Sequence, residues 1–342
     1  MRIKPPVLAD EDQTDEAELW FLPGPTGDGD GDLAPDLPPL PRAPRLAPLD
    51  LAEWQAAEAA LAQELAALAH DAGRLDERLA GMGEGAALRL ASAEALALGW
   101  WTGDRVAADR LALWLSFRLG ATGEDGRGLA RISWAARRLA AGLGAGGPQA
   151  GLAAILSLPG PDAGWIGEAA EALAPLTLLH PATRGAAAFR FWQQLDERPD
   201  HLRGLEAAIL AARLGAPGRL PFLPMALAGV GGLTASGSAA RRLAGWLTGT
   251  HQAVLAALMR LDRLRQWHLR ASAAVAGLQG RTPPLLIGCL LRHPMVSAPQ
   301  AQKETGASRA AVERNLTLLE ARGLIREVTG AGRFRVWTAS DG

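Results

Sequence analysis

The residues of this sequence that are best suited to chemistry lie near its C-terminus, and their types are those that bind phosphates and bases. Ser308 and Arg309 stand at the expected start of a helix, where backbone N–H groups and the helix dipole favour an anion. Arg314 follows on the same segment, and its guanidinium can donate two hydrogen bonds to guanine O6 and N7. These residues indicate nucleic-acid recognition.

The helix that would carry these side chains has one apolar face. Val312, Leu316 and Leu319 recur at i, i+4 and i+7, which predicts that they are buried together. The opposite side then faces a partner, and Thr317 on that side could contact a thymine methyl group or a phosphate. Arg333 and Arg335 of a predicted hairpin would reach the DNA backbone or an adjacent minor groove. The full set of expected DNA contacts is Ser308, Arg309, Ala310, Glu313, Arg314, Thr317, Arg333 and Arg335.

No constellation typical of an enzyme accompanies them. The six histidines lie far apart, and none forms a zinc-ligand pair such as H-E-x-x-H. Neither a Walker A loop nor a G-x-S-x-G elbow occurs. The glycine-rich run at 142–147 follows a predicted helix and precedes a proline, which favours a linker over a dinucleotide-binding loop. We therefore expect no catalytic residue, no cofactor and no metal ion, and no enzymatic activity.

One stretch, LHPATRGAAAFR at residues 179–190, resembles the H-P-F-x-[D/E]-G-N-G-R signature of Fic-domain nucleotidyl transferases. His180, Pro181 and Gly185 match. Arg184 replaces the acid that holds magnesium, and alanine replaces both the asparagine and the phosphate-binding arginine. Without these groups nothing neutralises the charge of a triphosphate, so the resemblance implies a degenerate domain. A helix-capping role for His180 is the alternative explanation.

Two helices are expected before the helix that begins at Ser308. The apolar run from Leu285 to Leu291 should end at His293-Pro294, because proline lacks the N–H that a helix interior requires. A short polar segment at 298–304 follows, and then a turn that precedes Ser308, which is expected to cap the next helix.

Beyond that helix the pattern changes from helical to alternating. Gly323 predicts a left-handed stop, and residues 325–328 and 334–337 alternate like two strands joined by a turn. This order of helices and strands resembles the winged helix-turn-helix module of bacterial transcription regulators.

The whole arrangement is similar to an uncharacterised family of alphaproteobacterial helix-turn-helix proteins. The motifs that carry the similarity are RLDERL at 74–79, WWTG at 100–103 and VTGAGRFRVW at 328–337. The family implies a helical body, distantly similar to a Fic domain and without its catalytic motif, ahead of a C-terminal DNA-binding domain. It implies no activity for that body.

Helical periodicity organises the rest of the chain. The spacing of apolar residues from Leu51 to Leu79 predicts one amphipathic helix or two, and a turn is expected at 99–104. Further helices are expected at 86–98, 105–119, 128–142, 151–157, 165–180, 184–197, 201–214 and 222–230. The predicted fold class is mainly α: a multi-helix body that resembles a degenerate Fic domain, followed by a C-terminal winged helix-turn-helix with a small β-hairpin.

Four regions are expected. They are a disordered acidic arm rich in proline and glycine (1–48), a helical body (49–237), a long basic connecting helix with a hinge (238–280) and the winged helix-turn-helix (281–342). The apolar stripe of the long helix could span the core or pair two subunits, and its arginines could help to grip DNA.

Charge is polarised along the chain. Residues 1–50 hold four basic and eleven acidic residues, whereas residues 241–342 hold fourteen arginines and one lysine against six acidic residues. A basic C-terminal third is expected of a surface that faces phosphates. The single cysteine, Cys289, is expected to be a small core residue. Because neither a signal peptide nor a long uncharged apolar run is visible, we predict a cytoplasmic protein without membrane contact.

We interpret the sequence as a DNA-binding transcriptional regulator that binds double-stranded DNA, with a helical body that forms a homodimer or senses a partner. Two alternatives stay open: a helical adaptor whose winged helix binds protein, and a residual Fic-type nucleotidyl transferase. Phosphate contacts make DNA binding strongly salt-dependent, so insensitivity to salt would favour the adaptor. Nucleotide transfer that is lost in His180→Ala would favour the transferase.

Overall fold

The computed structural model describes residues 49–117, 124–141, 148–156, 164–195, 200–330 and 335–340. Within these ranges the chain forms fourteen α-helices, one 3-10 helix and one three-stranded antiparallel sheet, which confirms the mainly α fold class. The predicted arm at 1–48, the linker at 142–147 and Arg333 lie outside the described residues. None of the described helices is both long and apolar enough to cross a membrane.

The body is built from helices whose apolar faces meet in one core. The predicted segment 51–79 forms two helices, because the chain leaves helical geometry at Leu61. The helices of the body are α1 (Leu51–Ala60), α2 (Ala62–Met82), α3 (Glu84–Thr102), α4 (Ala108–Phe117), α5 (Glu124–Ala140), α6 (Pro148–Leu156), α7 (Gly164–Leu173), the 3-10 helix η1 (Ala174–Leu178), α8 (Pro181–Gln193), α9 (Asp200–Leu214) and the short α10 (Gly231–Thr234).

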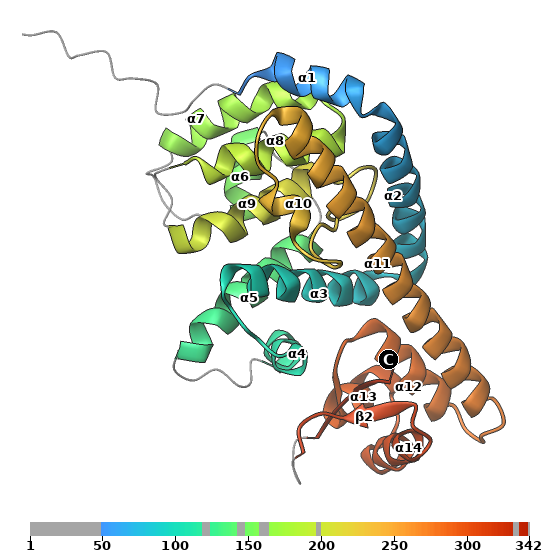
Figure 1. Cartoon of the computed structure of the whole chain (residues 1–342). Coiled ribbons are helices and arrows are strands. Elements are labelled where there is room, and N and C mark those ends of the chain that lie inside the picture. The colour runs from blue at the N-terminus through green and yellow to red at the C-terminus, as the bar shows by residue number, and fades with distance from the viewer. Residues whose placement is uncertain are drawn as a thin grey trace, which may run out of the picture. The chain divides into compact units, whose positions relative to one another are not determined.

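The long helix α11 (Ala239–Val275) runs from the body to the C-terminal helices (Figure 1). Ser238 caps it, since its Oγ accepts a hydrogen bond from the Arg241 N–H at 3.4 Å. Its predicted apolar stripe is buried and packs mainly against α2, α10 and α1. The stripe is therefore occupied within one chain and is not the surface through which two subunits would pair.

Two expectations about the body are wrong. The predicted turn at 99–104 is helical as far as Thr102, and α3 ends only at Gly103, which adopts a left-handed φ of 93°. The predicted helix at 222–230 is irregular chain instead. There the buried carboxylate of Glu94 accepts hydrogen bonds from the N–H groups of Met225 and Ala226, both at 2.8 Å. These N–H groups are satisfied without a helix.

The C-terminal domain contains three helices and the small sheet. In chain order its elements are α12 (Thr282–Arg292), β1 (Val296–Ser297), α13 (Ala298–Thr305), α14 (Arg309–Ala321), β2 (Ile325–Glu327) and β3 (Val336–Ala339). The strand order is β1-β3-β2, and β3 pairs antiparallel with both neighbours. The first predicted strand is confirmed as β2, whereas the second lies two residues later than expected, and the two-residue β1 was not predicted.

Specific contacts hold the C-terminal domain to the body, and both belong to one compact unit. Arg89 of α3 donates from Nη2 to the carbonyl oxygens of Leu290 at 2.6 Å and His293 at 2.7 Å. Arg326 of β2 donates two hydrogen bonds to the carboxylate of Asp109 on α4, at 2.9 and 2.6 Å. These contacts fix how the domain is presented.

Candidate nucleic-acid interface

The turn between α13 and α14 has helix-turn-helix geometry. Ser297 caps α13, because its Oγ accepts a hydrogen bond from the Gln300 N–H at 3.4 Å. Gly306 ends the helix with a left-handed φ of 65°, which glycine adopts without steric cost. Only Ala307 and Ser308 separate Gly306 from α14, so the helices are joined by the short glycine-containing turn typical of this motif.

Ser308 begins α14 in the way that the sequence predicts. Its Oγ accepts a hydrogen bond from the Ala311 N–H at 3.3 Å, and its hydroxyl proton remains able to donate to a phosphate oxygen. Val312, Leu316 and Leu319 are all 0% exposed and pack α14 against α12 and α13. The predicted buried face is thereby confirmed.

The opposite side of α14 faces solvent. Ala310, Glu313, Arg314 and Thr317 are all exposed, as their helical spacing predicts. The Arg314 guanidinium has no hydrogen-bond or ion-pair partner in the described part of the chain. Its donors are therefore not engaged by any of these residues and can be offered to a ligand.

Arg309 already has a partner on the same helix. Its Nε donates a hydrogen bond to Glu313 Oε1 at 2.8 Å, and the two side chains are 72% and 48% exposed. Such an exposed pair one turn apart stabilises a helix only slightly. Arg309 can therefore exchange Glu313 for a phosphate at little cost.

The two arginines expected on the hairpin, Arg333 and Arg335, remain to be placed. Arg333 lies outside the described residues. Arg335 forms an ion pair with Glu320 of α14, Nη2 to Oε2 at 2.9 Å, and its guanidinium lies over the Trp337 ring, 4.9 Å from the centroid. The Trp337 indole donates to the same carboxylate oxygen at 3.2 Å. A phosphate contact by Arg335 stays a prediction, and it would have to compete with this tie between α14 and β3.

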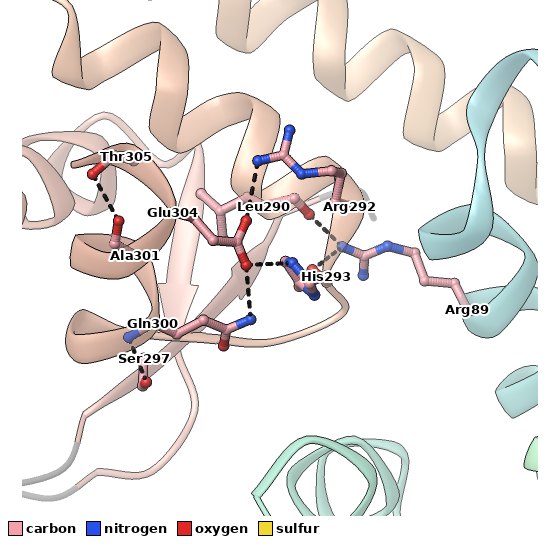
Figure 2. A network of polar contacts seen from close by, with 9 residues as sticks. All are labelled: Arg89, Leu290, Arg292, His293, Ser297, Gln300, Ala301, Glu304 and Thr305. Carbon is pink, nitrogen blue, oxygen red and sulfur yellow. Dashed lines mark hydrogen bonds and ion pairs between the residues drawn. The ribbon is translucent and has the colours of Figure 1, made fainter.

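A polar network between α12 and α13 was not foreseen. Glu304 lies at its centre in Figure 2, with Arg292, His293 and Gln300 directed at its carboxylate. Arg292 Nη2 is 3.0 Å from Oε2, while His293 Nε2 is 2.5 Å and Gln300 Nε2 is 3.3 Å from Oε1. This network joins the first two helices of the domain.

Cys289 lies against the same carboxylate. It is 0% exposed, so the expectation of a small core residue is confirmed. Burial and the neighbouring Glu304 carboxylate raise the pKa of the Cys289 thiol to about 12. The spacing Cys289-x-x-x-His293 is a signal that could have drawn attention to this place, because residues four apart share one face of a helix.

The residues of the Fic-like stretch have structural roles. His180 caps α8, since its Nδ1 accepts a hydrogen bond from the Ala182 N–H at 3.2 Å, so the capping explanation is confirmed. Burial lowers the pKa of His180. Pro181 occupies the first position of α8, where its missing N–H has no consequence. Gly185 allows α8 to approach α9, because a Cβ there would lie 2.8 Å from the Ala211 carbonyl oxygen.

The comparisons with known proteins bear on the C-terminal domain. Residues 283–339 match a family described as an HTH DNA binding domain. A search of curated proteins finds no match to the chain. The matched range begins in α12 and ends with β3, so it covers the capped helices, the Gly306 turn and the exposed face of α14. In both sequence and geometry, this part of the chain is similar to helix-turn-helix DNA-binding domains.

Proposed function

We propose that this protein is a transcriptional regulator that binds double-stranded DNA through α14, with β2 and β3 acting as the wing of a winged helix. The observation that carries the proposal is the position of Arg314. It lies on the exposed face of the second helix of the helix-turn-helix, within the matched range, and has no partner among the described residues. Such a face enters the major groove in proteins with this motif.

Each exposed residue of α14 then has a role set by its chemistry. Arg314 reads a guanine edge through two hydrogen bonds. Arg309 and the Ser308 hydroxyl bind phosphates at the helix N-terminus, where the helix dipole assists them. Thr317 meets a thymine methyl group or a phosphate. Glu313 holds Arg309 in the absence of DNA, and its carboxylate can accept a hydrogen bond from cytosine N4.

The body controls how α14 is presented. Arg89 and the Asp109–Arg326 pair fix the domain on α3 and α4, so a change in the body would move the DNA-binding face. A cavity of about 420 Å³ lies at this junction. Residues from both sides line it, among them Ala93, Leu96, Trp100, Leu115, Met295 and Thr338. Its place at the junction and its mainly apolar lining support a sensing role for the body, and Arg89, Asp109 and Arg260 add charged groups to that lining.

Catalysis is not part of the proposed function. The three residues that match the Fic signature cap a helix, begin it and permit close helix packing, so none needs a catalytic explanation. The adaptor hypothesis predicts a protein ligand for α14, but a helix N-terminus together with the unpaired Arg314 on the exposed face of the same helix is better suited to phosphates and bases.

Selection of bound DNA from a random pool by the purified full-length protein tests the proposal. We expect enrichment of a defined site and an affinity for it that falls steeply with salt. Arg219→Ala, which removes an exposed arginine of the body, is the control and should leave enrichment unchanged. Failure to enrich any sequence at low salt would refute DNA reading, and salt-insensitive capture of a protein would favour the adaptor.

A further inference from the structure

Three side chains with metal-binding atoms lie close together between α12 and α13 of the C-terminal domain. Cys289 and His293 lie one turn apart at the end of α12, and Glu304 projects from α13. The Cys289 sulfur, one ring nitrogen of His293 and one carboxylate oxygen of Glu304 all lie within 4.8 Å of one another. A single ion between them would need only small side-chain rotations, since metal–ligand bonds are about 2.0–2.3 Å long.

The surroundings hold these ligands in place. The carbonyl oxygen of His293 accepts a hydrogen bond from Arg89 at 2.7 Å, which fixes the backbone that carries the imidazole (Figure 2). Arg292 binds Glu304 Oε2 at 3.0 Å and leaves Oε1 directed at His293. Outer hydrogen bonds of this kind orient the ligands in metal sites.

We propose that Cys289, His293 and Glu304 bind a divalent transition metal ion, with zinc the best suited. One thiolate, one imidazole and one carboxylate are ligands that zinc accepts, whereas magnesium and calcium prefer oxygen ligands alone. Two anionic ligands neutralise a divalent ion. The His293 side chain is 38% exposed, so solvent can supply a fourth ligand on that side. The site was not expected from the sequence because the histidines form no pair.

Binding exchanges protons for the metal in a balanced way. The metal–sulfur bond forms as the Cys289 thiol gives its proton to solvent. His293 coordinates through Nε2, the nitrogen that now faces Glu304, so the proton held between Nε2 and the Glu304 carboxylate is also released to solvent and the neutral imidazole carries its one proton on Nδ1. Glu304 contributes Oε1, while Oε2 stays with Arg292. No oxidation or reduction occurs.

The ion would tie α12 to α13 and thereby stabilise the helix-turn-helix. An effect of the metal on DNA affinity rests on the proposed function, but metal binding itself does not. Direct measurement of binding therefore separates a failure of this proposal from a failure of DNA recognition.

Cobalt(II) titration of the tag-free, chelator-treated full-length protein tests the site. The chain has one cysteine, so a thiolate-to-cobalt charge-transfer band reports on Cys289 alone. We expect that band at one ion per chain, its loss on addition of zinc, and a rise in the thermal midpoint with zinc. Cys289→Ser should abolish the band.

Glu304→Gln and His293→Gln change partly exposed side chains, so they disturb folding less than a change at the buried Cys289. Each should weaken zinc binding at least tenfold and remove the thermal shift. Glu64→Gln and His268→Gln, which lie outside the cluster, are matched controls and should bind as the unaltered protein does. The proposal is overturned if folded protein gives no charge-transfer band at saturating cobalt. It is equally overturned if the Glu304 and His293 variants bind zinc as tightly as the controls.

Discussion

The indole Nε1 of Trp267 on α11 donates a hydrogen bond of 2.7 Å to the carbonyl oxygen of Leu324, which lies between α14 and β2. Trp267 is 0% exposed, so this bond forms away from solvent. A second hydrogen bond joins the same two parts of the chain: Arg322 at the end of α14 donates from Nη1 to the carbonyl oxygen of Ala274 on α11 at 2.5 Å. The long helix α11 therefore holds the C-terminal end of α14, the helix to which we assign DNA binding.

We expect Trp267→Phe to lower the free energy of unfolding by about 1–3 kcal/mol, because it removes a buried hydrogen bond and some packing volume. The Leu324 carbonyl still accepts a hydrogen bond from the Ser340 N–H at 3.1 Å, which limits the loss. Urea denaturation measures the change. Trp100→Phe, at a side chain 60% exposed, is the control and should change stability by less than about 0.5 kcal/mol. Equal effects would contradict a specific role for Trp267.

Arg89→Ala should detach the C-terminal domain from α3 more than any other single change at this junction. The guanidinium bridges the carbonyl oxygens of Leu290 and His293, and hydrogen bonds from a charged donor contribute about 1.5–3 kcal/mol. Faster amide hydrogen exchange at the end of α12 is expected. Arg89→Lys should rescue little, because an ammonium cannot reproduce the planar fork. Full rescue by lysine would mean that charge alone matters.

The sequence predicts helix α14 well, because the signals that determine it are local. Ser308 and the spacing of Val312, Leu316 and Leu319 determine the cap and the buried face of α14. The irregular chain at 222–230 could not be predicted, because its backbone is satisfied by Glu94, more than a hundred residues earlier. The contact of Cys289 and His293 with Glu304 also joins separate helices, so local spacing does not predict it. The same holds for the ion pair between Arg335 and Glu320.

Gly185→Ala should destabilise the body by about 1–3 kcal/mol through overpacking. The new Cβ would lie 2.8 Å from the Ala211 carbonyl oxygen and 3.3 Å from the Trp246 ring. Gly73→Ala on α2 is the matched control, since a Cβ there meets nothing within 4 Å. It should stabilise the protein by about 0.5–1 kcal/mol through helix propensity. Thermal unfolding of both variants checks this, and a neutral Gly185→Ala would remove the packing explanation for this part of the Fic-like stretch.

Glu94 should make stability depend on pH. Burial raises its pKa from 4.5 to about 7 against the opposing effect of its backbone hydrogen bonds. Between pH 4.5 and about 7 the unfolded chain loses this proton while the folded chain keeps it, so the free energy of unfolding falls as pH rises. Above about 7 the folded carboxyl ionises as well and the fall stops.

The comparison of Glu94→Gln with the unaltered protein isolates this effect, because the amide oxygen can still accept from Met225 and Ala226. From pH 4.5 to 7.5 the variant should gain about 3 kcal/mol relative to the unaltered protein, since one pKa unit corresponds to about 1.4 kcal/mol. Urea denaturation at several pH values measures it. A difference that stays constant with pH would show that Glu94 ionises normally.

Replacing each of the two arginines on α14 should change DNA binding in a different way. Arg314→Ala takes away the group that we propose reads a base, so binding to the selected site should weaken by about 1–3 kcal/mol and preference at one base pair should disappear. Arg309→Ala takes away the phosphate contact that we propose for it, so binding to all sequences should weaken about equally and the salt slope should fall by about one. Fluorescence anisotropy with the selected site and a scrambled site at several salt concentrations separates these outcomes.

The Arg309–Glu313 pair complicates that comparison, because Arg309→Ala also leaves an exposed carboxylate near DNA phosphates. Glu313→Gln on its own frees Arg309 without adding repulsion, and it should tighten binding to every sequence if Glu313 only restrains Arg309. If Glu313 instead accepts a hydrogen bond from a cytosine, the same variant should weaken binding to the selected site alone. A double variant, Arg309→Ala with Glu313→Gln, then reports the phosphate contact without the unpaired charge. If the double variant bound every sequence as tightly as Glu313→Gln alone, Arg309 would have no part in holding DNA.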